Sequence, residues 1–129
     1  MKKIRDNRSG FTLVEVIAVL VILGILAAVA IPKYIDLQIN AETRALDAGF
    51  SELNGREALT WGNVKLSQSG WTSDADVTGS ADYDTDLGPD YTLTTTDLEF
   101  GSRTRPITRT GSLTTTPARW VWGGPAVAQ

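Results

Sequence analysis

The sequence predicts an α+β fold, in which one long N-terminal helix packs by its second half on a small antiparallel sheet. Three observations predict it: an apolar run, an amphipathic continuation of that run, and a remainder rich in Thr, Gly and Asp with short alternating segments. The expected organisation is a basic leader over residues 1–10, a helix over residues 11–62 and a small β-rich head over residues 63–129.

Composition narrows the function before any motif is considered. The 129 residues include no cysteine and no histidine, and the formal net charge is −3. Without cysteine there is no disulfide and no thiolate nucleophile, and without histidine the commonest general base and zinc ligand are missing. Because no nucleophile–base pair is visible either, we do not expect an enzyme. We also expect no resident cofactor and no nucleic-acid partner.

The apolar run extends over residues 11–31, where Glu15 is the one strongly polar side chain. As a helix these residues would span roughly 31 Å at about 1.5 Å per residue, which matches a bilayer core of about 30 Å. Basic residues precede the run, and Asp6 alone opposes them: Lys2, Lys3, Arg5 and Arg8. Since basic flanks stay in the cytoplasm, the N-terminus is expected inside and the rest of the chain outside.

A cleaved secretory signal is the alternative reading of this segment. Ala28-Val29-Ala30 offers a small-x-small cleavage site, and cutting after Ala30 would release a soluble protein. The apolar run is longer than the usual core of about 7–15 residues, and a glutamate in that core would hinder insertion. We therefore favour a retained helix.

Glu15 needs a positive partner. A charged group deep in a membrane helix costs about 2.5–3.5 kcal/mol and usually faces a partner rather than lipid. Residues 11–31 contain no basic side chain. Cutting the Gly10–Phe11 bond would create a free α-amino group, largely positive at neutral pH. That amine on one chain could pair with the carboxylate of a neighbouring chain.

These residues carry a family resemblance. "GFTLVE", with a basic leader before it and an apolar helix after it, resembles the N-terminal signal of type IV pilins and pseudopilins, and "ILGILAAVAIPKYIDLQ" is similar to type IVa and MSHA-like bacterial pilins. The resemblance implies a type IV pilin-like fold, cleavage by prepilin peptidase after Gly10, N-methylation of Phe11 and a role for Glu15 in assembly. It implies further that Gly24 and Pro32 are weak points of the helix, which loses order there in the filament.

The chain after Ile31 continues the helix with an apolar stripe. At 100° per residue its members fall within an arc of about 60°: Ile35, Ile39, Leu46, Phe50 and Leu53. Glu42 interrupts the stripe, Gly49 weakens the helix, and Glu52 and Arg56 form an i, i+4 pair. We expect the helix to end near Trp61-Gly62-Asn63.

Four segments of the head are expected to be strands: Tyr91–Thr95, Leu98–Phe100, Arg103–Thr110 and Ala118–Trp122. Pro106 within the third suggests an edge strand, because proline cannot donate to a ladder. Trp120 and Trp122 share one face, and core packing is favoured over a ligand-stacking surface. Residues 123–129 are expected to be a loose tail.

Acidic residues precede the basic ones in the head. Asp82, Asp84 and Asp86 approximate a calcium loop, but Leu87 and Leu93 stand where an EF-hand needs glycine and glutamate. Calcium binding here is a hypothesis, and no other metal is expected. Docking of acidic and basic regions between neighbouring subunits, and a merely solvated loop, are the alternatives.

The sequence therefore predicts a structural subunit of a type IV pilus, held in the cytoplasmic membrane as a precursor and then polymerised through its apolar helix into an extracellular filament. Implied partners are other copies of the chain, prepilin peptidase, and an assembly ATPase with its platform protein. A pseudopilin of a type II secretion system, within a pseudopilus that spans the periplasm, is the alternative. A membrane-anchored or secreted periplasmic binding protein is the alternative from another class.

Overall fold

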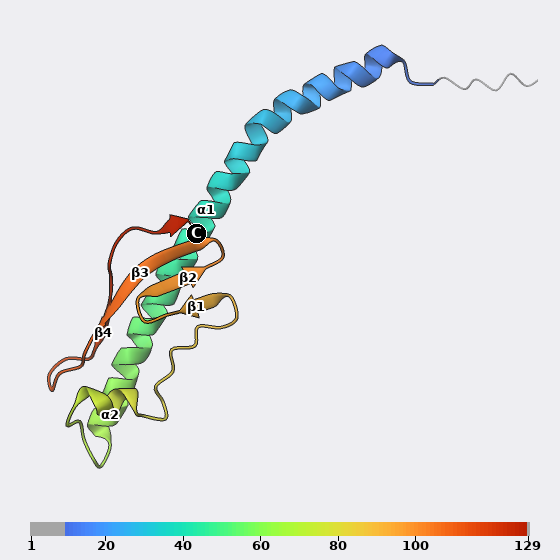
Figure 1. Ribbon diagram of the computed structural model, residues 1–129. Coiled ribbons are helices and arrows are strands. Elements are labelled where there is room, and N and C mark those ends of the chain that lie inside the picture. The colour runs from blue at the N-terminus through green and yellow to red at the C-terminus, as the bar shows by residue number, and fades with distance from the viewer. Residues whose placement is uncertain (1–9, 129) are drawn as a thin grey trace, which may run out of the picture. The chain divides into compact units, whose positions relative to one another are not determined.

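The computed structural model describes residues 10–128 and contains two helices and five strands among them (Figure 1). The elements in chain order are α1 (Leu13–Leu66), α2 (Asp74–Thr78), β1 (Tyr91–Leu93), β2 (Asp97–Phe100), β3 (Arg103–Thr110), β4 (Arg119–Trp122) and β5 (Val127–Ala128). Contacts divide the chain into two compact units, one up to Leu37 and one from Gln38 onward. Helix α1 contributes residues to both units.

In the first unit the apolar side chains of α1 are exposed. Leu20, Leu26 and Ile31 are 61%, 61% and 59% exposed, and their apolar neighbours are similar. The helix is long and apolar enough to cross a membrane, by length and composition. Burying this surface would be strongly favourable, so the segment requires lipid or other apolar partners around it.

In the second unit α1 supplies two of the five buried side chains of the hydrophobic core. Leu46 and Leu53 are fully buried and pack with Leu98, Ile107 and Trp120 from the strands. The predicted stripe is thus confirmed for its later members, with Phe50 packed against the core. The prediction that the stripe is buried is wrong for Ile35 and Ile39, which are 52% and 37% exposed.

The helix also continues past its predicted end near Asn63 and stops at Leu66. Gly70, with φ of 66°, follows in the turn after it. Glycine adopts this left-handed conformation at no steric cost, so the chain reverses direction here rather than at Gly62.

Gly49 allows the closest contact between α1 and the sheet. A Cβ atom at this position would lie 2.6 Å from Cε1 of Tyr91, a distance that real Cβ atoms do not show. The Tyr91 hydroxyl donates to the carbonyl oxygen of Ala45 at 2.8 Å. Gly49 weakens the helix locally, but its lack of a side chain lets the Tyr91 ring pack against α1.

The strands form one antiparallel sheet in the order β1-β2-β3-β4, and β5 also pairs with β3. Figure 1 shows these strands lying along the second part of α1. Tyr91 pairs with Phe100 between β1 and β2, and Ile107 pairs with Trp122 between β3 and β4. The fold is the expected α+β arrangement of a helix on a small antiparallel sheet.

Strand β3 is central, so the prediction of an edge strand from Pro106 is wrong. It pairs with β2 on one side, and with β5 and β4 in turn on the other. β4 ends at Trp122 and β5 begins at Val127, and Pro106 lies between the two stretches of β3 that they pair with. The carbonyl oxygen of Pro106 accepts from Gly123 at 2.7 Å. The missing N–H falls where the ladder is already interrupted, which is why proline is tolerated.

The C-terminal segment is also more ordered than a loose tail. Val127 pairs with Thr104, and Ala126 packs against the core. Arg105 Nε donates to the carbonyl oxygen of Gly124 at 2.7 Å. Alternation is the main sequence signal for a strand, and a two-residue strand is too short to show it.

The tryptophans of β4 face α1, as predicted. Trp120 is 8% exposed, and the Trp122 ring stacks on Phe50 with centroids 4.1 Å apart. The Arg105 guanidinium covers Trp122 at 3.9 Å from the ring centroid. Both rings therefore serve packing, and neither is left as a surface for stacking a ligand.

Candidate functional site

The N-terminal assembly segment, residues 10–20, is the first candidate site. Gly10 and Phe11 lie before the start of α1, and Phe11 is 87% exposed. The bond between them is therefore accessible. Cleavage there stays a prediction, as does methylation of Phe11, and residues 1–9 of the expected leader lie outside the described residues.

Glu15 closes a capping box at the helix start. Its carboxylate accepts from the backbone N–H of Thr12 at 2.9 Å and from the Thr12 hydroxyl at 3.0 Å. The Glu15 N–H donates in return to Thr12 Oγ1 at 3.2 Å. This is the reciprocal Thr-x-x-Glu pattern, which satisfies two backbone donors that a helix start leaves unpaired.

The capping box was missed at the sequence level although "TLVE" carries its signature. It gives Glu15 a role within one chain, since two hydrogen bonds reduce the penalty of a carboxylate among apolar residues. It leaves the negative charge uncompensated, because Thr12 donates hydrogen bonds but is neutral. A positive partner is still needed for full compensation, and no basic side chain of residues 10–31 can supply it.

Phe11 and Glu15 also line a shallow apolar groove with Val16, Val19 and Leu20, with a volume of about 260 Å³. The groove places a carboxylate at the edge of a purely hydrocarbon surface.

The two predicted weak points lie inside an unbroken helix. Gly24 and Pro32 are both within α1, and a Cβ atom added at Gly24 would meet nothing within 4 Å. Pro32 lacks the N–H of a normal helix bond, so the helix is weakened there even where its path continues. Loss of helical order between these residues is a prediction about the filament.

The acidic loop is organised by hydrogen bonds to its own backbone. Asp84 Oδ1 accepts from the N–H of Asp86, and Asp86 Oδ1 accepts from the N–H of Gly88, both at 2.8 Å. Ser80 Oγ accepts from the N–H of Asp82 in the same i, i+2 manner. Consecutive turns of this type explain carboxylates at every second position.

The same loop is fastened to α1. Arg56 donates to an Asp84 carboxylate oxygen and to the Asp86 carbonyl oxygen, both at 2.9 Å, and Asn63 contacts Asp82 at 3.4 Å. Residues 10–128 contain no group of three carboxylates placed to hold a metal ion. Calcium binding by Asp82, Asp84 and Asp86 stays a prediction, which a thermal shift in excess calcium against chelator would test.

A buried polar cluster joins α1, α2 and β3. It was not predicted from the sequence. Glu57 is 1% exposed and pairs with the Arg109 guanidinium through both carboxylate oxygens. Arg109 also donates to both oxygens of Asp74, at 2.7 and 3.1 Å. Tyr83 and Ser112 complete the cluster with hydrogen bonds to Glu57 and Asp74. One sequence signal existed: Glu57 stands four residues after Leu53, on the apolar stripe.

The cluster shifts the pKa values of Asp74, Arg109 and Tyr83. The hydrogen bonds from Arg109 hold the pKa of the Asp74 carboxyl far below its usual range. Burial lowers the pKa of Arg109, but the hydrogen bonds that Arg109 donates to Glu57 and Asp74 outweigh it and raise the pKa overall. Burial, and then the Glu57 carboxylate, raise the pKa of Tyr83 to about 12.

These ion pairs both involve one arginine of the head, Arg109, and a second, Arg105, pairs with Asp47 at 3.0 Å. Of the acidic residues from Asp74 to Glu99, Asp74 and Asp84 form ion pairs within the described part of the chain. Glu52 and Arg56 form the predicted i, i+4 pair at 2.8 Å.

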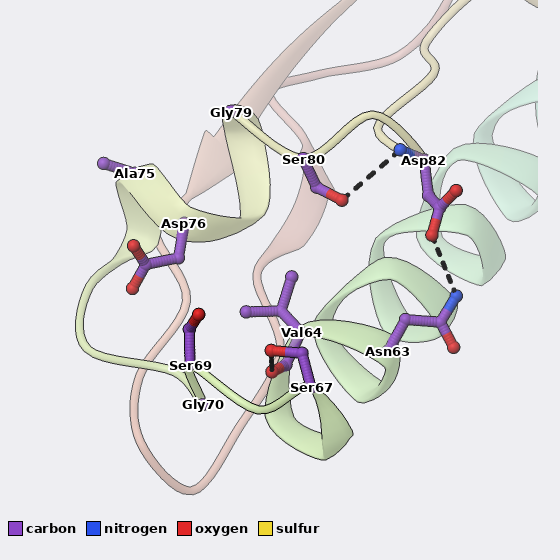
Figure 2. Close-up of a pocket in the computed structure, with 10 residues that line it drawn as sticks. All are labelled: Asn63, Val64, Ser67, Ser69, Gly70, Ala75, Asp76, Gly79, Ser80 and Asp82. Carbon is purple, nitrogen blue, oxygen red and sulfur yellow. Dashed lines mark hydrogen bonds between the residues drawn. The ribbon is translucent and has the colours of Figure 1, made fainter.

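A pocket of about 430 Å³ lies between the end of α1 and α2 (Figure 2). Its lining carries hydroxyl, amide and carboxylate groups and no basic side chain: Asn63, Val64, Ser67, Ser69, Gly70, Ala75, Asp76, Gly79, Ser80 and Asp82. Asp76 accepts three hydrogen bonds from Thr72 and Ser73 at the start of α2.

A capped apolar helix with an accessible bond before it is thus joined to a head that contains a small antiparallel sheet. The family model of the prokaryotic N-terminal methylation motif matches residues 5–31. The chain is also 28% identical over 110 residues to the type IV narrow pilus major component PilA5 of Thermus thermophilus, covering 78% of this chain and 95% of that relative. No solved structure matches the chain.

The motif and the relative support a resemblance to the type IV pilin family. Members of this family are structural subunits rather than enzymes, which agrees with the absence of a nucleophile–base pair in the sequence. They are processed by prepilin peptidase and polymerise with copies of themselves. The motif and the apolar helix fit a membrane-anchored precursor that later enters a filament.

Proposed function

We propose that this protein is a structural subunit of a type IV pilus, cut between Gly10 and Phe11 and methylated at Phe11. The observation that carries the proposal is the exposed apolar surface of α1 with one carboxylate, Glu15, beside the cleavage position. That surface is stable only in lipid or among copies of itself. The membrane holds the precursor with the head outside, and the filament then replaces lipid as the partner.

In the filament, Glu15 of one copy pairs with the Phe11 amine of the next. The pair is worth more in an apolar bundle than in water, because the dielectric is low and an unpaired carboxylate would be penalised. It also sets the register between neighbouring helices, since a displaced copy would leave both charges alone. An assembly ATPase and its platform protein drive insertion of each copy.

The relative from Thermus thermophilus is a major pilus component, which supports a pilus over the pseudopilus of a type II secretion system. Roles in adhesion, motility and surface attachment follow from that assignment. Electron microscopy of surface filaments from producing cells, with and without the chain, distinguishes the two. Deletion of a pilus subunit removes the extracellular filaments, whereas deletion of a pseudopilin leaves them intact and stops secretion. A periplasmic binding protein, the remaining alternative, gives neither phenotype.

Substitution of Glu15 tests the pairing directly. Glu15→Ala should leave processing largely intact and abolish filaments, measured by N-terminal mass analysis and by the yield of sheared filaments. Glu15→Gln is the matched control, because glutamine still closes the capping box but carries no charge. The proposal expects Glu15→Gln to lose filaments as well. Normal filaments from either variant would reject the charge-pair role of Glu15.

A further inference from the structure

The pocket between the end of α1 and α2 is polar, and filament assembly through the apolar segment gives it no task. Its volume of about 430 Å³ lies within the range of small-molecule sites, about 300–1,000 Å³. Figure 2 shows the side chains of Val64 and Ser69 pointing from α1 and the following turn towards α2, whereas Ser80 points back towards α1. Three segments of the head therefore line one space.

The backbone around the pocket is held in place by the hydrogen bonds of the fold. Thr60 Oγ1 donates to the carbonyl oxygen of Asp82 at 3.3 Å, and Ser67 Oγ donates to a carbonyl oxygen in the last turn of α1 at 2.7 Å. On the opposite side, Asp74 at the start of α2 accepts two hydrogen bonds from Arg109. The pocket is therefore formed before any ligand binds, as is usual for small-molecule sites.

Several polar groups of the lining have hydrogen-bonding capacity that the fold leaves unused. Within residues 10–128 the Ser69 hydroxyl makes no hydrogen bond. Ser80 Oγ accepts from the N–H of Asp82 at 3.3 Å, and its hydroxyl hydrogen has no acceptor in the described part of the chain. Asp82 accepts through one carboxylate oxygen, from Asn63 at 3.4 Å, and Asp76 likewise accepts through one of its two oxygens. The pocket thus presents both donors and acceptors to a ligand.

The chemistry of the lining disfavours charged ligands. No basic side chain lines the pocket, so a phosphate, sulfate or carboxylate group would meet only neutral groups and like charge. Among the described residues, no three carboxylates are placed to hold a metal ion. Asp76 already accepts three hydrogen bonds of 2.6–2.7 Å, which stabilise its charge. An organic cation would use the remaining carboxylate oxygens but would leave the donors of Ser69 and Ser80 without a partner.

A neutral ligand with several hydroxyl groups uses all of these features. Each hydroxyl has one donor and two acceptor lone pairs, so it can bond to a serine hydroxyl and to a carboxylate at the same time. A hydrogen bond to a charged acceptor such as Asp82 is stronger than one between neutral groups. Val64 and Ala75 supply an apolar contact for the C–H groups of a sugar ring. A pyranose ring combines these properties in one compact group.

We propose that this pocket binds a neutral polyhydroxylated ligand, namely a pyranose ring of a saccharide. Asp82 and Asn63 accept hydrogen bonds from neighbouring ring hydroxyls. Ser69 and Ser80 donate to the ring oxygens, and no covalent bond forms or breaks. A free sugar and the end of a longer saccharide share this chemistry. The whole site lies in the unit from Gln38 onward, so binding does not require assembly through Glu15.

Saturation-transfer NMR on the full mature chain, in a detergent without a sugar headgroup, tests the proposal. The probes are the methyl glycosides of glucose, galactose and mannose, each beside a soluble trisaccharide of the same sugar. Ring protons of at least one probe should receive saturation from the wild-type chain.

Two variants and a control locate the binding. Asp82→Ala should weaken it by about tenfold, because a hydrogen bond to a charged group is lost. Ser69→Phe fills the pocket from the turn and should abolish binding. Asp90→Ala changes an exposed aspartate outside the pocket lining and should leave binding unchanged.

Amide shifts of the isotope-labelled wild-type chain give an answer even if a variant fails to fold, because a probe should shift amides within residues 63–82. Stronger binding of a trisaccharide indicates a chain end and equal binding a free sugar, and both support the proposal. Absence of saturation with every probe overturns it, as does unchanged binding in either variant. Displacement of the sugar by putrescine would assign the pocket to a cation and overturn it as well. None of these outcomes depends on whether the filament is a pilus or a pseudopilus.

Discussion

The two parts of α1 are stabilised by different surroundings. Up to Leu37 the helix exposes its apolar side chains on every face, whereas from Gln38 onward it buries Leu46 and Leu53 against the sheet and pairs Glu57 with Arg109. Each part also contains a glutamate among apolar residues. Glu57 finds its cation in the same chain, and within residues 10–128 Glu15 is bonded to the neutral donor Thr12. The head therefore buries its apolar side chains and pairs its buried glutamate within one chain, whereas the first part of α1 does neither.

The largest effect on the head should come from removing the cation of its buried cluster. Arg109→Leu leaves the carboxylate of Glu57, 2% of whose side chain is exposed, without its partner. Breaking a buried pair in this way typically costs about 3–5 kcal/mol. Chemical denaturation of the detergent-solubilised chain, followed by tryptophan fluorescence, should show this loss. A loss below about 1 kcal/mol would mean that the cluster is solvated and that the head is not closed around it.

A leucine pair tests the difference between the two parts of α1 directly. Leu53→Ala removes a side chain that is 1% exposed and should destabilise the head by about 2–5 kcal/mol. Leu20→Ala, at a side chain that is 61% exposed, should leave the unfolding midpoint of the head unchanged. Its effect should appear in filament stability, because only neighbouring copies cover it. Equal effects of both variants on head unfolding would contradict the comparison.

Gly49→Ala should have an intermediate effect. Alanine favours the helix by about 0.5–1 kcal/mol, but its Cβ would collide with the Tyr91 ring. Overpacking typically costs about 1–3 kcal/mol, so net destabilisation is expected. Gly55→Ala is the matched control, since a Cβ there meets nothing within 4 Å and the propensity gain alone should appear. Stabilisation by Gly49→Ala would show that Tyr91 does not lie against the helix.

The smallest effect is the acid response of Asp74. Its pKa is lower in the folded chain than the ordinary value of 3.8, so its contribution to stability is present above that value and is lost as pH falls towards the folded pKa. Stability should therefore fall between about pH 5 and pH 2, and Asp74→Asn should make this acid limb shallower. Melting temperatures measured across this range would check it, with Asp90→Asn as the exposed control. Identical acid limbs in the wild type and Asp74→Asn would exclude the ion pair.

Most of the fold could be predicted because its signals are local. The apolar run, the stripe through Leu46 and Leu53, and the alternation of Arg119–Trp122 each depend on periodicity within one segment. The central position of β3 could not be predicted, because it depends on where β4 ends and β5 begins, which is a pairing between distant segments. β5 itself is too short to show alternation.

The candidate site was predictable to the same extent. Gly10, Phe11 and Glu15 stand in a short motif, so their positions were clear from the sequence, whereas their roles remain to be measured. The capping box of Thr12 is local and was visible in principle. The cluster of Glu57, Asp74 and Arg109 was not, because its members are brought together only by packing of α1, α2 and β3.

A high-resolution map of the assembled filament tests the central claim most directly. The account predicts that each chain begins at Phe11 and that its terminal nitrogen lies within about 4 Å of the Glu15 carboxylate of a neighbouring copy. A filament in which Glu15 remains bonded to Thr12 alone, or in which the chain begins at another residue, would contradict it.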